Sequence, residues 1–391
     1  MRLENNKGLL ICGGMLMAGL LISGCHHKNK KNSDQGAKRP ERVIPAYYKN
    51  FQGTVGSEKV TLQLIKYSER YEGIFLDDST GQPLSLAGSK DSSGQLVLVS
   101  YYRYNPVDTF VGKFPQPGVF QGTFSDTAGQ HAPFTLQEIY PAGTIHWNVY
   151  TLSDSLSLDS AKHSSPMARV RLMLLWPKEK SLSAGQSSLL EDSLVKNYGS
   201  LDTVLRDPAK VLRVVEDTFL TQYKKFGESL RSSDYGTMAA TFNWQFNVSM
   251  QLLWNAGNIV SLAFKNYQYT GGAHGLGNTT LKVFDLKQGK VLRLKDIFKP
   301  GYEHILQQVL EEHLRMAYDI PAGAPLNGEA GILFDKHLAL TKNFYVTGKG
   351  IGFIYNPYEV APYVVGEIEL YVPFSEITDI LMPGVYMPQT P

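Results

Sequence analysis

Short segments in which apolar and polar residues alternate recur between Tyr47 and Tyr140, and this period of two constrains the fold more than any other feature of the sequence. Successive side chains of a β-strand point to opposite faces, so each alternating segment predicts a strand. Turn signals such as Asp-Ser-Thr-Gly at 78–81 and Ser-Ser-Gly at 92–94 separate the segments, and no long helical pattern interrupts them. We therefore predict an antiparallel meander that is strongly curved or closed into a small barrel. The predicted strands cover residues 51–56, 60–65, 71–75, 84–88, 96–100, 109–114, 119–124 and 134–138.

Glycine recurs inside these predicted strands, at Gly53, Gly73, Gly112 and Gly122. A glycine in a strand interior suits a bend where the strand curls, as closing a barrel requires. The interior of such a barrel can hold a ligand, but side chains fill small barrels more often. We expect a filled core here.

The remainder of the chain mixes helix and strand signals. Asp207 and Pro208 open the clearest helix, because Asp is a favoured N-cap and Pro is favoured at the first helical position. Its apolar residues continue at helical spacing to Leu230, and further helices are predicted over 187–198 and 302–318. Strands are predicted over 145–150, 170–176, 242–254, 259–269, 281–286, 291–294, 344–346, 352–355 and 367–372. The fold class is α+β: an N-terminal all-β meander or small barrel, then an α+β domain with helices packed on an antiparallel sheet.

Composition and motifs exclude several classes of function. The chain has 391 residues with 38 Lys and Arg against 36 Asp and Glu, a balance that does not indicate a nucleic-acid partner. Its two cysteines are Cys12 and Cys25, both close to the N-terminus. No HExxH, Gly-x-Ser-x-Gly or clustered His/Asp pattern is present in the sequence. We therefore predict no catalytic residue, no metal ligand and no cofactor.

The N-terminus has the form of a lipoprotein signal peptide. Arg2 and Lys7 precede an apolar run over 8–22, which is too short for a comfortable membrane span. The run ends in Ser23-Gly24-Cys25, where small residues stand directly before a cysteine that can accept lipid. We predict cleavage after residue 24 and acylation of Cys25, so that the chain's partner through this anchor is the membrane. Mature protein would then hold no disulfide and no free thiol.

Four segments follow from these patterns. We predict a signal peptide at 1–24, a lipidated cysteine and flexible basic tether at 25–44, a β-rich domain at 45–140 and an α+β domain at 141–391. The tether contains almost no apolar residues and so cannot bury a core. Residue 26 is His rather than Asp, which does not indicate retention at an inner membrane. The expected location is the cell envelope, with the outer membrane favoured in a host that has one.

Three motifs in the second half of the chain carry a family resemblance. They are YQYTGGAHG at 267–275, a segment from Val283 to Phe298 with GKVLRLKDIF at its end, and a segment from Phe344 to Tyr363 that includes NPYEVAPY. This series resembles the extracytoplasmic domain of unknown function shared by the lysozyme-sensing anti-sigma factor RsiV and the peptidoglycan deacetylase PdaC. The resemblance extends from about Val170 to Leu381 and implies an accessory or sensor domain, with c-type lysozyme or peptidoglycan as candidate ligands. Neither the deacetylase catalytic motifs nor an anti-sigma segment is recognised.

The same motifs supply the candidate binding residues. The loop at 270–275 has two interpretations. In the first, its glycines adopt positive φ and their backbone N–H groups form an anion-binding nest beside His274. In the second, the glycines only turn the chain, and His274 hydrogen-bonds a loop carbonyl. The segment 355–363 is either a turn in which Glu359 caps backbone donors or a surface of exposed tyrosines. The candidate ligand-binding residues are Tyr267, Tyr269, Gly271, Gly272, His274, Tyr355, Tyr358, Glu359 and Tyr363.

Three functions remain open from the sequence. The first is a non-enzymatic binding or sensing role in the cell envelope, toward a lysozyme-like protein or peptidoglycan. The second is a hydrolase of cell-wall or surface glycans, whose carboxylates would come from Asp285, Asp296 and Glu359 with His274 as acid or base. The third is a structural envelope scaffold.

Overall fold

The computed structural model describes residues 46–160, 165–178, 182–199, 201, 205–230 and 239–384. The predicted signal peptide, the predicted acylation site Cys25 and the predicted tether at 25–44 lie outside these residues. Within the described ranges, no helix combines the length and the apolar composition that crossing a bilayer requires.

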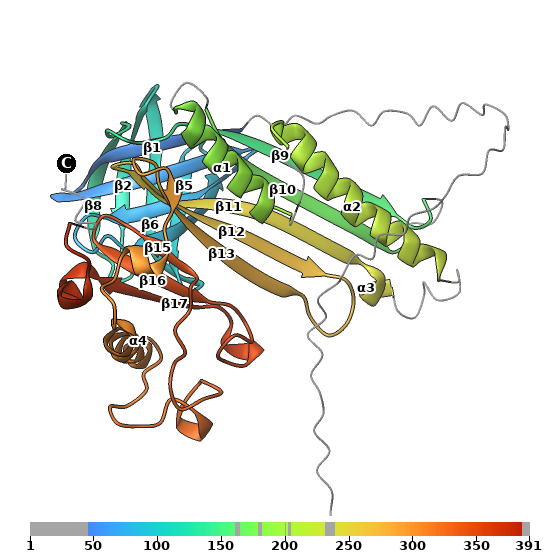
Figure 1. Ribbon diagram of the computed structural model, residues 1–391. Helices are drawn as coiled ribbons and strands as arrows, with labels where there is room; N and C mark the ends of the chain where they lie inside the picture. The colour runs from blue at the N-terminus through green and yellow to red at the C-terminus, as the bar shows by residue number, and fades with distance from the viewer. Residues whose placement is uncertain are drawn as a thin grey trace, which may run out of the picture. The chain divides into compact units, whose positions relative to one another are not determined.

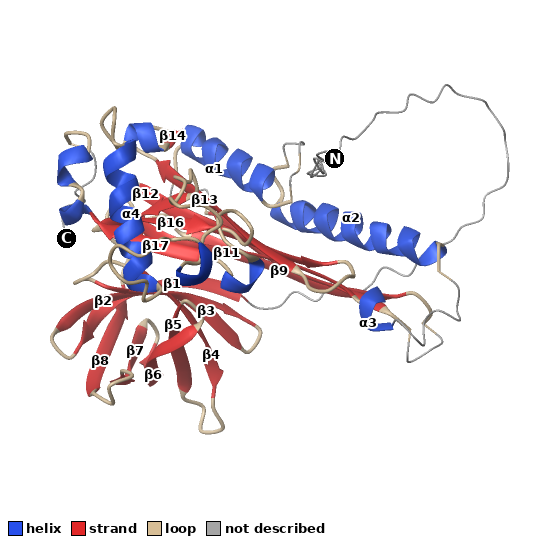
Figure 2. Ribbon diagram, turned by 90° about the horizontal axis from the view of Figure 1, so that it is seen from below, coloured by secondary structure: helices blue, strands red, loops and turns tan. Residues whose placement is uncertain are grey.

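The N-terminal strands form a closed antiparallel barrel, which confirms the predicted meander (Figure 2). Each strand pairs with the next along the chain, and the last pairs with the first over Phe51–Val55 and Phe134–Glu138, so that the sheet has no free edge. The eight strands are β1 (Ala46–Val55), β2 (Glu58–Tyr67), β3 (Arg70–Asp77), β4 (Pro83–Lys90), β5 (Leu96–Tyr102), β6 (Asn105–Gln116), β7 (Val119–Ser125) and β8 (His131–Glu138).

Aromatic side chains fill the barrel interior. Phe110 is fully buried, and its ring centroid lies 5.1 Å from that of Phe75, 5.0 Å from Phe124 and 5.4 Å from Phe134. The predicted glycines lie where strands approach most closely: Gly112 pairs directly with Gly122. A Cβ on Gly122 would overlap the backbone of Val111, so only glycine fits the bend.

A six-stranded sheet follows the barrel, in the order β14-β13-β12-β11-β10-β9. Its pairs are antiparallel except for β10 and β11, which are parallel. The prediction of a wholly antiparallel sheet is wrong at this pair, because the helical connection between β10 and β11 returns the chain to the same end of the sheet. The strands are β9 (Trp147–Ser157), β10 (Met167–Pro177), β11 (Trp244–Ala256), β12 (Ile259–Tyr269), β13 (Leu276–Asp285) and β14 (Lys290–Val291).

Helices α1 (Ala184–Asn197) and α2 (Pro208–Glu228) cover one face of this sheet, and the short α3 (Ala239–Phe242) leads into β11 (Figure 1). The Asp207 carboxylate accepts hydrogen bonds from the backbone N–H of Ala209 at 3.0 Å and of Lys210 at 3.3 Å, as the N-cap prediction requires. Phe219 and Tyr223 point into the sheet and are nearly or fully buried. The cap therefore places the apolar stripe of α2 in register with the sheet.

The C-terminal part forms a second, three-stranded sheet, made of β15 (Phe344–Val346), β16 (Gly350–Tyr355) and β17 (Ile368–Pro373). Helix α4 (Glu303–Ala317) packs on its outer face through the fully buried Leu306, Leu310 and Leu314. The predicted helix over 302–318 thus exists but covers this small sheet instead of the large one. The inner face of the small sheet packs against Ala263 and Leu281 of the large sheet, on the side opposite α1 and α2.

A buried polar network joins the barrel to the large sheet. The side-chain oxygen of Asn255, at the end of β11, accepts the Ile145 N–H at 2.9 Å, and its amide nitrogen donates to the Ile145 carbonyl at 2.8 Å. The same nitrogen lies 3.3 Å from the hydroxyl of Tyr48, which donates to Gln63 across the first barrel strands at 2.9 Å. Asn255 is 5 % exposed, so water cannot easily replace it.

We expect Asn255→Ala to lower the free energy of unfolding by about 2–4 kcal/mol, because two buried backbone groups of Ile145 would lose their partner. Urea unfolding followed by circular dichroism measures this change. Asn266→Ala, at an exposed position on β12, is the matched control and should change stability little. Equal stabilities for the two variants would refute a structural role for the network.

A carboxylic acid lies between the two sheets. The hydroxyl of the fully buried Tyr345 donates to the Glu369 carboxylate at 2.7 Å. Burial raises the pKa of Glu369 above its ordinary value, against the hydrogen bond from Tyr345, which lowers it. The folded protein therefore binds this proton more tightly than the unfolded chain does.

Removing this carboxylate should make the protein more stable at neutral pH, because burying it there costs wild type the free energy of desolvating its charge or of protonating it. A raised folded-state pKa means that wild type gains stability as the pH falls through that pKa, with the full gain present below the unfolded pKa. The stability advantage of Glu369→Gln should therefore shrink as the pH is lowered from 7 toward 4. Urea unfolding across this range tests it, with the exposed Glu312→Gln as control. An advantage independent of pH would contradict the assignment.

Candidate functional site

The loop between β12 and β13 begins the candidate site. Gly271 and Gly272 have φ values of 103° and 92°, the left-handed region that the sequence predicts for this turn. The hydroxyl of Tyr269 donates to the Gly272 carbonyl at 3.0 Å and so ties the loop back to its strand. This path carries His274 to the surface of the molecule.

His274 stacks with two tyrosines from the segment after β16. Its ring centroid lies 3.8 Å from that of Tyr363, with 16° between the planes, and the Tyr358 ring lies 5.6 Å from Tyr363. Nδ1 of His274 lies 3.1 Å from the Gly275 carbonyl, which can only accept, so Nδ1 carries the proton. Nε2 is then free to accept from the Tyr358 hydroxyl at 3.4 Å. We refer to His274, Tyr358 and Tyr363 as the tyrosine–histidine cluster.

A tight turn presents Tyr358 to solvent. The Glu359 carboxylate accepts from the Asn356 N–H at 2.9 Å, and the Glu359 N–H donates to the Asn356 carbonyl at 3.0 Å. Glu359 therefore caps the turn, as one interpretation of the sequence proposed. Tyr358 adopts a φ of 70° although it is not glycine, and 53 % of its surface is exposed. A large aromatic residue held exposed in the left-handed region is the kind of strain that collects at functional sites.

Side-chain amides fix this turn to the large sheet. The Asn356 side chain accepts from the Thr279 N–H at 2.6 Å and donates to the Thr279 carbonyl at 3.1 Å. Asn343 makes the equivalent contacts one step along β13, accepting from the Leu281 N–H at 2.7 Å and donating to the Thr279 carbonyl at 2.9 Å. Sequence reasoning missed both residues. The one sequence feature that marks them is position: Asn343 stands directly before β15, and Asn356 stands directly after β16.

The structure brings most of the predicted residues together. The ring of Tyr267 lies against Gly275, where a Cβ would collide with it, and Tyr267 is 37 % exposed next to the cluster. Tyr355 is not part of this surface, because it is 1 % exposed and packs in the core under α4. The expectation of an exposed Tyr355 fails because β16 is the central strand of the small sheet and is buried along its whole length.

The carboxylates proposed for a hydrolase do not converge on His274. Asp285 ends β13, whereas His274 precedes the start of that ten-residue strand, about 30 Å away along it. Asp296 lies 3.0 Å from the Lys290 ammonium and accepts from the Arg293 backbone, so it closes a local turn. Glu359 is near the cluster but is engaged in its own turn. No three His, Cys, Asp or Glu side chains of the described part of the chain are grouped as a metal site requires.

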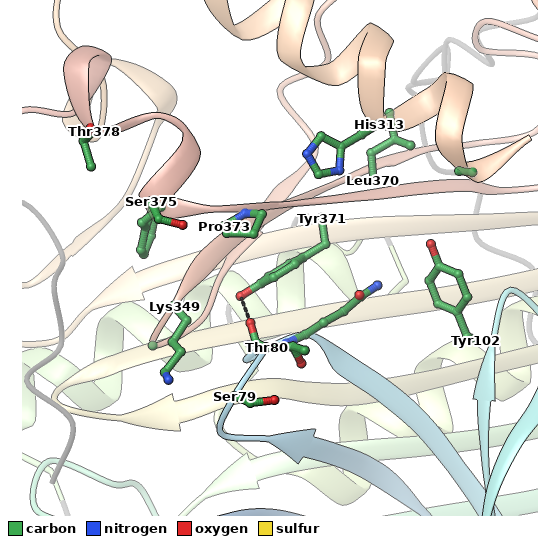
Figure 3. Close-up of a pocket in the computed structure, with 14 residues that line it drawn as sticks. Ser79, Thr80, Tyr102, His313, Lys349, Leu370, Tyr371, Pro373, Ser375 and Thr378 are labelled. Atoms are coloured by element: carbon green, nitrogen blue, oxygen red, sulfur yellow. Dashed lines mark hydrogen bonds between the residues drawn. The ribbon is translucent and has the colours of Figure 1, made fainter. Parts of the chain in front are cut away.

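A separate cleft of about 770 Å³ lies where the β3–β4 turn of the barrel meets the small sheet (Figure 3). The Tyr371 hydroxyl crosses it to donate to the Thr80 carbonyl at 3.2 Å, and Lys349 lines it beside the turn. On the side of α4, His313 contacts the Glu376 carboxylate at 2.7 Å. No residue of the tyrosine–histidine cluster lines this cleft. Sequence reasoning missed it because its walls come from widely separated segments.

Two adjoining regions of the chain match known protein families. Residues 194–277 match the domain family described as deacetylase PdaC, and residues 295–375 match the protein family of unknown function DUF3298. His274 falls in the first region, and Tyr358 and Tyr363 fall in the second. The cluster therefore joins the two matched regions, and neither of them includes the barrel.

One curated relative is the peptidoglycan-N-acetylmuramic acid deacetylase PdaC of Bacillus subtilis strain 168, which is 29 % identical over 141 residues. The match covers 35 % of this chain and 29 % of the length of that enzyme.

One solved structure of a DUF3298 protein shows the fold of this part of the chain. A member from Bacteroides fragilis superposes with a TM-score of 0.54 at 21 % identity, over 62 % of this chain and 95 % of that one. A second, from Pseudomonas aeruginosa PAO1, gives a TM-score of 0.41 at 16 % identity, over 61 % and 96 %. The chain thus carries a PdaC region followed by a DUF3298 region over residues 194–375, which confirms the resemblance predicted from its sequence motifs.

Proposed function

We propose that this chain is a lipid-anchored binding or sensing protein of the cell envelope, and that it contacts its ligand through the tyrosine–histidine cluster. The relation to PdaC and to the DUF3298 family suggests an accessory envelope domain. The finer assignment, a non-enzymatic role toward peptidoglycan or a lysozyme-like protein, is our proposal.

The observation that carries the proposal is an exposed aromatic stack on a rigid support. His274 and Tyr363 stack at 3.8 Å, and Tyr358 stands beside them with 53 % of its surface in solvent. The Asn356 amide fixes the loop to β13, so little side-chain or loop entropy remains to be lost on binding. Rigid tyrosines with one polar end are enriched where proteins recognise partners.

The chemistry of the stack supports binding more than catalysis. Both ring nitrogens of His274 are engaged, one with the Gly275 carbonyl and one with the Tyr358 hydroxyl. An acid or base for hydrolysis needs a free nitrogen and a paired carboxylate within reach. Glu359, the carboxylate next to Tyr358 in sequence, is occupied by the Asn356 backbone. The candidate ligands come from the relatives: PdaC is named for peptidoglycan, and the predicted resemblance implies lysozyme.

Calorimetric titration of the purified full chain with c-type lysozyme and with muropeptides tests the binding site. We expect micromolar or tighter binding of at least one of them, weakened about tenfold or more by Tyr358→Ala or His274→Ala, since such aromatic anchors dominate binding energy. The matched controls are Tyr104→Ala, which removes a tyrosine that is 79 % exposed on the barrel, and His304→Ala on the exposed side of α4. No heat with either ligand, or equal losses in controls and cluster variants, would exclude the proposed site.

A labelling experiment tests the anchor. Cells that express the chain are grown with an alkyne analogue of palmitate. The wild type and the Cys12→Ser variant should become labelled, but Cys25→Ser should not, because only Cys25 stands at the predicted cleavage site. Cys25→Ser should also move from the membrane fraction to the soluble fraction, since one thioether-linked diacylglycerol supplies most of the attachment. Labelling of Cys25→Ser would overturn the lipoprotein assignment.

A further inference from the structure

The large sheet has a second face that the small sheet covers only at one end. Val170 and Val248 point toward α1 and α2, so their strand neighbours Arg171 and Asn247 point to the opposite side. Ala263 and Leu281, on that same side, pack against the small sheet. Figure 1 shows the strands continuing toward α3 beyond the end that the small sheet covers.

The register of the strands places cations, amides and tyrosines side by side on this face. Arg171 is opposite Ser153 on one side and Asn247 on the other, and Asn247 is opposite Tyr267. Directly opposed residues of neighbouring strands point to the same face, so these four form a row. The next row toward α3 contains Arg169, Gln245 and Tyr269 in the same order. We refer to both rows together as the arginine–tyrosine face.

This face is positively charged. On this side of segments 151–157, 167–173, 245–251 and 263–269, the charged side chains are Arg169, Arg171 and Lys265. Beside Lys265, the Glu367 carboxylate accepts from the Thr279 hydroxyl of β13, so the uncompensated positive charge lies at Arg169 and Arg171. Arg169 and Arg171 are exposed and have no ion-pair partner among the described residues. Unpaired guanidinium groups that point in one direction favour a planar anionic group such as a carboxylate, which they bind through paired hydrogen bonds.

A hollow of about 410 Å³ lies at the inner end of the row, where the β2–β3 turn of the barrel approaches the sheet. Arg171 and Asn247 line it together with Thr151, and Glu69, Arg70 and Glu72 line it from the barrel side. The Thr151 hydroxyl oxygen and the Asn247 side-chain oxygen are buried without a hydrogen-bond partner in the described structure. Buried polar atoms of this kind normally bind a partner, so the hollow lacks donors that a ligand would supply.

We propose that the hollow and the arginine–tyrosine face bind an acidic saccharide. Sugar hydroxyls both donate and accept, as the unsatisfied oxygens of Thr151 and Asn247 require, and a sugar carboxylate pairs with Arg171. The face of a pyranose ring packs on Tyr267. Tyr267 lies two strand spacings, or about 10 Å, from Arg171, so the sugar unit on Tyr267 and the sugar unit whose carboxylate pairs with Arg171 are different units of the ligand. On the opposite wall the Glu72 carboxylate already accepts from the Tyr67 hydroxyl, so Glu69 is the carboxylate that accepts from a sugar hydroxyl, and Arg70 beside it offsets part of the acidic charge. The volume falls within the usual range of small-molecule sites.

This site contains none of the three residues of the tyrosine–histidine cluster, although Tyr267 lies next to that cluster. It deepens the proposed function and rests on it in one respect, because N-acetylmuramic acid is a component of peptidoglycan. An acidic protein surface would also be attracted to Arg169 and Arg171. A flat surface would leave the hollow and its two unsatisfied oxygens without partners, so the geometry favours the saccharide.

The experiment compares two sugars that differ by one lactyl ether group, which carries a carboxylate. N-acetylmuramic acid carries a lactyl carboxylate that N-acetylglucosamine lacks, and binding of each to the purified full chain is measured by ligand-observed NMR titration. We expect the acidic sugar to bind about tenfold more tightly, the gain of a charge-assisted contact, and Arg171→Gln to abolish that preference. Arg171→Lys should retain part of it.

Two further variants locate the contact. Arg169→Gln lies one row beyond the hollow, so it should leave the monosaccharide affinity unchanged and weaken binding of a longer acidic glycan. Tyr358→Ala should affect neither, which separates this result from a failure of the proposed function. Equal binding of the two sugars, no binding of either, or an Arg171-dependent interaction with poly-glutamate and not with the acidic sugar would overturn the proposal.

Discussion

The apolar residues on both faces of the large sheet must be covered, and this requirement organises the C-terminal part of the molecule. The parallel pair of β10 and β11 forces a helical crossover, which places α1 and α2 on one face. The small sheet with α4 covers the other face at the end near the barrel. The strands of the large sheet are longer than this cover, so a polar stretch of their second face stays in contact with solvent. Both proposed binding surfaces lie at the boundary of the covered part.

Local patterns predicted nearly every element of this fold and the antiparallel meander of the barrel, but not the parallel pairing of β10 with β11. The period of two located all the barrel strands, and the Asp207 cap with Pro208 located the start of α2 to the residue. The parallel pair was missed because strand direction depends on where a long connection ends, and no local pattern records that. The side-chain bridges of Asn255 and Asn343 were also missed, since each joins segments more than 60 residues apart.

The candidate site was predicted in part for the same reason. His274, Tyr358 and Tyr363 stand in recognisable motifs, and the structure stacks them although they lie almost 90 residues apart. Tyr355 was misplaced because a short alternating segment does not reveal that its strand is covered on both sides. The row of Arg171, Asn247 and Tyr267 exists only through the register of β10, β11 and β12, and a shift of one residue would turn it to the other face.

The asparagine bridges also determine how the outer edge of β13 meets other chains. β14 pairs with only the last two residues of β13, so most of that edge would present free backbone groups to any extended strand. The Asn356 amide occupies both backbone groups of Thr279, and the Asn343 amide occupies the N–H of Leu281. Two side chains thus act as a substitute strand. They block edge-to-edge pairing at residues 279–281, a stretch of β13 that itself carries neither proline nor charge.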